Sequence, residues 1–209
     1  MTSHNVYVVD DDQAVRDSLR WLIESVGLKV KTFSNGQELL DDFSEADISC
    51  LVLDVRMPGI SGLDLQQRLK NLNSKVPVII VTGHADVPMA IQAMKAGAFD
   101  FIEKPYSDQL LLERIQCAIE QDACFKKQQT INDDINQRID SLTPRENEVM
   151  ALVVSGHSNK SIAKELGVSI KTVEVHRGNL MSKMKAKSLS ELVRIALTAD
   201  RTLKQAENS

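Results

Sequence analysis

The chain has 209 residues, a length that allows one large domain or two small ones. It is 43% hydrophobic but has neither an N-terminal leader pattern nor an apolar run near the about 20 residues that span a bilayer. The sequence therefore excludes a membrane protein and predicts a soluble, cytoplasmic one. Of the three cysteines, Cys50, Cys117 and Cys124, none has metal-ligand spacing and two lie in apolar patterns typical of a core, as in reduced intracellular proteins.

Charge is distributed unevenly along the chain. Residues 1–137 contain 13 basic and 21 acidic side chains, a net charge of −8, whereas residues 138–209 contain 12 and 8, a net charge of +4. A basic second half favours a polyanionic partner, although an asymmetry of this size also arises by chance.

Four short apolar runs each end in polar side chains. A run of this length, bounded by turn residues, fits a strand that is buried on both faces. The runs are residues 6–9 before Asp10, Asp11 and Asp12; 51–53 before Asp54; 78–81 before Thr82 and Gly83; and 101–103 before Lys104 and Pro105. Ligands of an open parallel sheet collect outside the carboxyl ends of its strands, so we expect these side chains to share one rim.

Helical periodicity alternates with the strands. Residues 29–33 predict a further strand, and the helical stretches are residues 15–26, 37–43, 61–72, 87–98 and one that begins near Ser107. Five strands alternating with five helices predict an α/β domain with a doubly wound, flavodoxin-like (βα)5 sheet of order 2-1-3-4-5. Strands one and three, which deliver Asp10 and Asp54, flank the switch point of that order.

The predicted rim suits phosphoryl chemistry. Clustered carboxylates repel one another unless a cation lies among them, and an all-oxygen set suits Mg²⁺ better than zinc. Together with Lys104, such an ion would attract phosphoryl oxygens, and Asp54 can then act as a nucleophile that forms an acyl phosphate. Ordinary polar residues at strand ends are the alternative, but four such ends in one domain favour a shared site.

Between the two halves, residues 116–138 contain no Pro or Gly and few apolar side chains. This pattern favours a helix that continues the last helix of the first domain, and a flexible linker is the alternative. Ile131, Ile135 and Ile139 recur every four residues and form a narrow stripe that a partner helix could cover in a short coiled coil.

Residues 142–199 predict four helices with clear boundaries. Thr143 and Glu146 form a capping-box pattern at the start of the first helix. The short second helix stops at Gly167, and Ser169 caps the third. Such a turn between two short helices is typical of a helix-turn-helix, whose second helix enters the major groove of DNA.

The exposed face of the third of these helices is predicted to meet DNA. Glu174 can accept from a cytosine amino group, Arg177 can bond guanine through two donors, and Val175 can touch a thymine methyl group. Gly178 lies on the same face. The predicted contacts with the DNA backbone are Lys160, Lys171, Thr172, His176, Lys183 and Lys185. A four-helix protein-interaction module with a solvated basic surface would show the same periodicity.

The rim residues give the first half a family resemblance. Asp10-Asp11, Asp54 in Leu-Asp-Val-Arg-Met-Pro-Gly, Thr82-Gly83 and Lys104-Pro105 resemble the receiver domain of two-component response regulators over about residues 4–122. The resemblance implies that a histidine kinase phosphorylates Asp54. It also implies that Mg²⁺ is bound by Asp11, Asp54 and the backbone carbonyl of Arg56, with Asp10 acting through water.

The same resemblance implies roles for residues near the phosphoryl group. Thr82 and Lys104 are expected to bind phosphoryl oxygens, Phe101 to change rotamer with the switch, and the Lys104–Pro105 bond to be cis. Gly83 is a departure, because many receivers have Ala or Ser there, and it removes side-chain bulk beside the phosphoryl pocket.

The second half resembles the LuxR-type helix-turn-helix at residues 142–146, 159–163 and 171–176. A receiver in front of it is the arrangement of the FixJ/NarL class of response regulators. The expected domains are a receiver, a helical linker and a DNA-binding domain, at residues 1–122, 123–139 and 140–209. The class implies a transcriptional regulator that forms a homodimer when phosphorylated, binds double-stranded promoter DNA and meets RNA polymerase. Its only expected catalysis is Mg²⁺-dependent self-phosphorylation from a phosphodonor and slow self-dephosphorylation.

Two rival functions use the same residues. A Mg²⁺-dependent phosphohydrolase would also have an acidic pocket, but such enzymes usually carry a second carboxylate two residues after the nucleophile, where this chain has Arg56. The other rival is a small-molecule sensor joined to a DNA-binding module, and the Asp, Thr and Lys side chains of the rim argue against it.

Overall fold

The structure, a computed structural model, describes residues 4–83 and 86–206. It divides into two compact units, Met1–Lys126 and Lys127–Ser209, which we call the N-terminal and C-terminal units. Within the described ranges, no helix is both long and apolar enough to cross a membrane.

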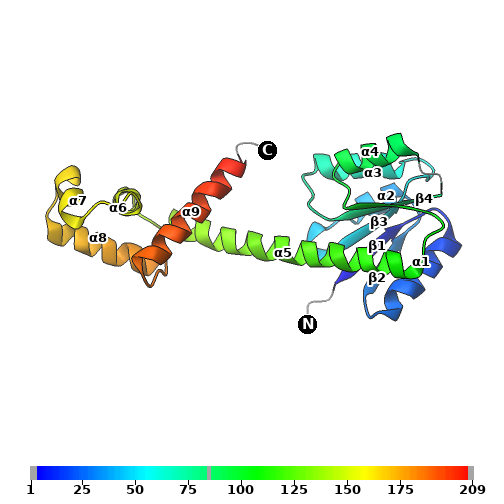
Figure 1. The fold of residues 1–209 in the computed structure, drawn as a ribbon, viewed down its shortest axis with the longest axis horizontal. Coiled ribbons are helices and arrows are strands. Elements are labelled where there is room, and N and C mark those ends of the chain that lie inside the picture. The colour runs from blue at the N-terminus through cyan, green and yellow to red at the C-terminus, as the bar shows by residue number, and fades with distance from the viewer. Residues whose placement is uncertain (1–3, 84–85, 207–209) are drawn as a thin grey trace. The chain divides into compact units, whose positions relative to one another are not determined.

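The N-terminal unit is built on a five-stranded parallel sheet (Figure 1). Its strands are β1 (Asn5–Val9), β2 (Lys29–Phe33), β3 (Cys50–Asp54), β4 (Val78–Thr82) and β5 (Asp100–Glu103). Their order, β2-β1-β3-β4-β5, confirms the predicted flavodoxin-like topology. Every residue of β3 and β4 is buried, because helices cover both faces of the sheet and the central strands need apolar side chains on both sides.

Helices cover the sheet in two layers (Figure 1). They are α1 (Gln13–Ser25), α2 (Gly36–Asp41), α3 (Gly62–Asn71), α4 (Val87–Lys95) and the first part of α5 (Asp108–Asp140), with a 3₁₀ turn, η1, at Glu45–Asp47. Side chains of α1 and α5 pack against one face, as Ile23 and Ile115 do. Side chains of α2, α3 and α4 pack against the other, as Leu65 and Ala93 do. Each face therefore has its own hydrophobic core.

The helix α5 is continuous through the stretch for which the sequence left a helix and a flexible linker open. Ile135 and Ile139 on this helix pack into the core of the C-terminal unit, whereas Ile131 is exposed. Two of the three stripe residues are therefore covered within the C-terminal unit, and Ile131 is the one left exposed for a partner helix.

One sequence prediction about the cysteines is also wrong. Cys50 is buried in β3, but Cys117 and Cys124 are both exposed on α5. The buried positions of this helix include Leu111, Ile115 and Ala118, and Cys117 and Cys124 lie on other faces. The apolar character of cysteine misleads here because the helix has a single buried face at this point.

Up to residue 206, the C-terminal unit consists of four helices and the last turns of α5. They are α6 (Pro144–Val154), α7 (Asn159–Leu166), α8 (Ile170–Lys183) and α9 (Leu189–Ala206). The capping box at Thr143 and Glu146 is present, Gly167 ends α7 in the left-handed conformation, and Ser169 caps α8, each as the sequence predicts. Val149, Ile162 and Leu180 form the centre of its core.

The first residue of α3 approaches the end of β3 very closely. A Cβ atom added to Gly62 would lie 2.2 Å from the backbone oxygen of Asp54, and the backbone N–H of Gly62 donates to the carbonyl of Val55 at 2.9 Å. Only glycine fits at this contact, because both partners are backbone and cannot rotate away. Gly62 thus holds the residue at the end of β3 in place.

We expect Gly62→Ala to destabilise the N-terminal unit by about 1–3 kcal/mol, because the new methyl group must displace backbone. Urea unfolding followed by circular dichroism, with the two units fitted separately, measures this change. The matched control is Gly83→Ala, since a Cβ there meets no described heavy atom within 4 Å. Equal stability of the two variants would contradict the assignment of a steric role to Gly62.

Candidate functional site

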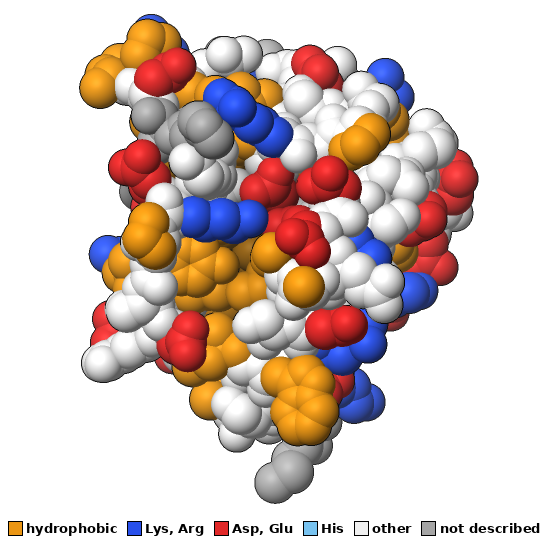
Figure 2. Space-filling view, turned by 90° about the vertical axis from the view of Figure 1, so that its right-hand side faces the viewer, with side chains coloured by type: hydrophobic (Ala, Val, Ile, Leu, Met, Phe, Trp, Pro, Cys, Tyr) orange, Lys and Arg blue, Asp and Glu red, His pale blue; other side chains and the backbone are white. Residues whose placement is uncertain are grey.

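The strands of the N-terminal unit bring three charged side chains together at their carboxyl ends. Asp10 follows β1, Asp54 is the last residue of β3, and Lys104 follows β5. The Nζ atom of Lys104 lies 3.0 Å from Oδ2 of Asp10 and 2.8 Å from Oδ1 of Asp54. Figure 2, which views the molecule from the side where these strands end, shows acidic side chains gathered near the middle of that face with basic ones beside them. We call Asp10, Asp54 and Lys104 the rim triad.

The second oxygen of each carboxylate bonds to its own loop. The backbone N–H of Arg56 donates to Oδ2 of Asp54 at 2.7 Å, and that of Asp12 donates to Oδ1 of Asp10 at 2.9 Å. Both carboxylates are buried, at 8% and 3% exposed. Every oxygen therefore has a donor, as burial of a carboxylate requires.

The charges of the rim triad shift its protonation equilibria. Burial raises the pKa of Asp10, and the hydrogen bond from Lys104 offsets this only in part. Burial also acts to lower the pKa of Lys104, but its hydrogen bonds to Asp54 and Asp10 outweigh that effect and the pKa is raised. On the alkaline side, the Lys104 contribution to stability is therefore lost as the pH rises from its usual pKa of about 10.4 through its raised pKa in the folded protein.

The remaining predicted residues of this site lie around the triad. Thr82 is fully buried at the end of β4, Gly83 beside it is exposed, and Phe101 on β5 is partly buried against the core. The Lys104–Pro105 peptide bond is cis, as the resemblance implies. Tyr106, which the sequence analysis missed, is half-buried near the triad, and burial raises the pKa of its hydroxyl.

The predicted metal ligands come together only in part. Among the described residues, no three His, Cys, Asp or Glu side chains form a group that could hold a metal ion. Asp10 and Asp54 share Lys104, whereas Asp11 is exposed. The donor chemistry nevertheless fits Mg²⁺, because the candidate ligands are all oxygens, two of them buried carboxylates and a third in the next residue along.

In the C-terminal unit, the predicted base readers fall into two groups. Glu174, Val175 and Gly178 are exposed on α8, with Val175 57% exposed. Arg177 is half-buried, and its Nη1 donates to Oδ1 of Asn159 at 2.8 Å. Asn159, at the start of α7, thus fixes the guanidinium, a contact that the sequence analysis did not predict.

The predicted phosphate contacts also differ among themselves. Lys160 and Lys171 are exposed on helices, His176 is half-buried, and the hydroxyl of Thr172 bonds that of Ser169 at the start of α8. Lys185 lies beyond the end of α8, with φ of 51°, and not on the helix as the sequence suggested.

Lys183 has partners inside its own unit. Its Nζ lies 2.7 Å from Oε2 of Glu146 and 3.0 Å from the carbonyl of Ser141. This ion pair lowers the pKa of Glu146 and connects the last turn of α8 to the capping box of α6. The structure therefore gives Lys183 a structural partner, which the prediction of a simple phosphate contact did not include.

Comparison with known proteins places both units in established families. Residues 6–116 match the response regulator receiver domain, and residues 140–196 match the bacterial regulatory proteins of the luxR family. The chain belongs to the response regulators, and its two domains make it a phosphorylation-activated transcriptional regulator of a two-component system.

Its relatives include FixJ-type regulators. The chain is 48% identical to the transcriptional regulatory protein FixJ of Bradyrhizobium diazoefficiens, over 95% of this chain and 97% of that protein. It is 43% identical to the response regulator protein TodT of Pseudomonas putida, over 91% and 84% of the two chains. Among solved structures, the response regulator StyR aligns with a TM-score of 0.88 at 41% identity, covering 93% of this chain and 98% of StyR.

We expect Lys104→Met to destabilise the N-terminal unit by about 2 kcal/mol at pH 7, because two buried carboxylates lose their cation. This is less than the ~3–5 kcal/mol of a fully buried pair, since the Lys104 side chain is 27% exposed. The loss should shrink as the pH falls and the Asp10 carboxyl, whose pKa burial raises, becomes protonated. Thermal melts from pH 3 to 7 measure it. Lys31→Met, which removes an exposed pair with Asp42, is the control and should show little change.

Proposed function

We propose that Asp54 is the residue that receives the phosphoryl group from the sensor kinase. An oxygen of Asp54 attacks the phosphorus of a phosphohistidine, the new O–P bond forms as the N–P bond breaks, and the imidazole takes back the electron pair and a proton. The observation that supports this most directly is Lys104 Nζ at 2.8 Å from Oδ1 of Asp54. A cation so close to the acceptor oxygen can bond the transferred phosphoryl oxygens and offset their charge.

Mg²⁺ is the cofactor that the donor set favours. Asp10, Asp11, Asp54 and the backbone carbonyl of Arg56 would hold it, and the bound ion would supply positive charge to the phosphoryl oxygens. Lys104 then exchanges its bond to Asp54 for one to a phosphoryl oxygen. Slow hydrolysis of the acyl phosphate by water would return the domain to its resting state.

We further propose that phosphorylation is transmitted through Thr82 and Phe101. Movement of the Thr82 hydroxyl toward a phosphoryl oxygen vacates space beside β5, into which the partly buried Phe101 can turn. The surface formed by α4 and β5 would then change and pair with a second copy about a two-fold axis. Permanent dimerisation through Ile131 and Ile135 is the less favoured route, because Ile135 is buried in the C-terminal unit and only Ile131 is exposed.

In this proposal the dimer places two α8 helices in successive major grooves, about 34–36 Å apart. Glu174, Val175 and Gly178 would lie against base edges, since they are exposed and on one helix, together with Arg177 once it is released or aimed by Asn159. Lys160, Lys171, Thr172, His176 and Lys185 would contact the DNA backbone. RNA polymerase is the further partner expected at a promoter.

We expect Asp54→Asn to abolish labelling by a small phosphodonor and to leave the protein monomeric in its presence, because the amide cannot form the acyl phosphate. The measurements are radiolabel incorporation with and without Mg²⁺, and sedimentation of the same samples. Asp64→Asn is the matched control, since Asp64 is exposed on α3. Undiminished, base-resistant labelling of the Asp54 variant would contradict the proposed acceptor.

Base readers and phosphate contacts should separate in DNA binding. Glu174→Ala should relax preference at one base pair by about 1–3 kcal/mol. Lys171→Ala should weaken binding to every duplex and reduce the slope of log K against log salt by about one. Lys183→Ala should instead lower the melting temperature, because it removes the partner of Glu146. Fluorescence anisotropy at several salt concentrations tests the two effects on DNA binding. Identical behaviour of the Glu174 and Lys171 variants would argue against assigning one to base reading and the other to phosphate contact.

A further inference from the structure

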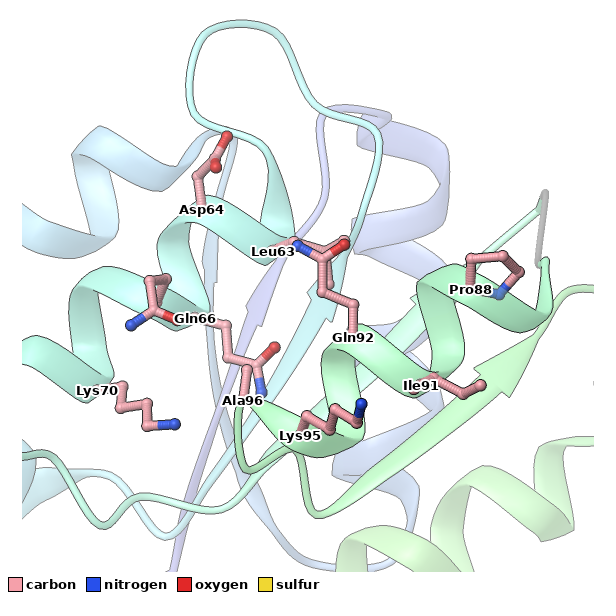
Figure 3. Close-up of a pocket in the computed structure, with 10 residues that line it drawn as sticks. Leu63, Asp64, Gln66, Lys70, Pro88, Ile91, Gln92, Lys95 and Ala96 are labelled. Atoms are coloured by element: carbon pink, nitrogen blue, oxygen red, sulfur yellow. The ribbon is translucent and has the colours of Figure 1, made fainter.

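A groove lies between α3 and α4, away from the rim triad (Figure 3). Its volume is about 580 Å³, and its walls include Leu63, Gln66, Lys70, Pro88, Ile91 and Lys95. We call it the α3–α4 groove. None of its lining residues belongs to the phosphoacceptor site or the DNA-binding surface described above.

The groove contains a buried polar atom without a partner. Gln66 is 3% exposed, and its Nε2 donates to the backbone carbonyl of Ala93 at 3.0 Å. Because a carbonyl can only accept, this bond fixes which way the amide faces and leaves Oε1 for another donor. Across the described residues, Oε1 of Gln66 is the one buried side-chain N or O atom that lacks a hydrogen bond. An unpaired buried acceptor is unfavourable, so the site favours a molecule that supplies a donor.

Charge on the groove is divided between its ends. Lys70 and Lys95 lie toward the same end in Figure 3, and among the described residues neither forms an ion pair. Asp64 lies toward the opposite end, where its carboxylate accepts from the hydroxyl of Ser61 at 2.6 Å. The lysine end is therefore suited to an anionic group.

An apolar wall completes the groove. Leu63, Pro88 and Ile91 line it, and Ile91 is 48% exposed although it is a large apolar side chain. A ring or short aliphatic body of a ligand would cover this surface and remove it from water.

We propose that the α3–α4 groove binds a small organic anion with an apolar body and one hydrogen-bond donor. The anionic group pairs with Lys70 and Lys95, the body covers Ile91 and its neighbours, and the donor bonds Oε1 of Gln66. Because Oε1 is buried, part of the groove wall must move aside as the ligand enters.

Occupation of this groove would act on α4. The carbonyl of Ala93 that accepts from Gln66 also accepts from the backbone N–H of Ala98 at 3.0 Å, a bond that closes the end of α4 before β5. A ligand bonded to Gln66 thus holds α3 and the end of α4 in one arrangement. Because phosphorylation is proposed to change the surface of α4 and β5, the two events would be coupled, but binding can be measured on the unphosphorylated chain.

The test uses three related probes on the full chain. The acid 3-(4-hydroxyphenyl)propanoate has the ring, the donor and the charge; its 4-methyl ether lacks the donor, and its neutral amide lacks the charge. In ¹H–¹⁵N spectra we expect the acid to shift amides of α3 and α4, with a dissociation constant on the order of 1 mM. The ether and the neutral amide should each bind at least about fivefold more weakly.

Variants locate the contacts. Gln66→Met should remove the difference between the acid and its methyl ether, and Lys95→Gln should remove the difference between the acid and its neutral amide. Lys29→Gln, an exposed lysine of β2, should change neither. No binding by the acid, equal binding of all three probes, or shifts confined to other elements would overturn the proposal. If Gln66→Met fails to fold, the comparison of the three probes on the unmodified chain still decides.

Discussion

Two carboxylates buried around one ammonium group determine the arrangement of the N-terminal unit. Removing Asp10 and Asp54 from water is unfavourable unless a cation and further donors compensate, and Lys104 bonds both of them. The three residues come from the ends of β1, β3 and β5, so the compensation requires these strands to run in the same direction and end at one level. A sheet of order β2-β1-β3-β4-β5 meets that requirement because β1 and β3 are neighbours.

A second ion pair connects two helices in the C-terminal unit. Lys183 at the end of α8 bonds Glu146, whose carboxylate also accepts from the backbone N–H of Thr143 at 2.9 Å. The helix that is proposed to meet DNA is thereby fixed to the start of α6. In the N-terminal unit the paired charges belong to the proposed phosphoacceptor site, whereas in the C-terminal unit the ion pair fixes the orientation of a helix.

Sequence patterns predicted most of this structure because strands and caps depend on neighbouring residues. The apolar run before Asp54 and the cap at Ser169 are local signals, and both elements form where expected. Features that depend on distant partners were not predicted. The sequence predicted that Lys183 is a surface cation, because its partner Glu146 lies 37 residues away in the chain. No sequence pattern indicated a role for Gln66, because its hydrogen bond is to Ala93 of another helix.

The contacts of α8 bear on how such regulators diversify. Val173 and Leu180 are fully buried and Lys183 is paired, whereas Glu174 and Val175 are exposed and have no structural role among the contacts described. Substitutions at the exposed positions can accumulate after gene duplication without loss of the fold. With the proposed base readers at those positions, one ancestral scaffold could give rise to paralogues that read different operators while the stabilising residues stay the same.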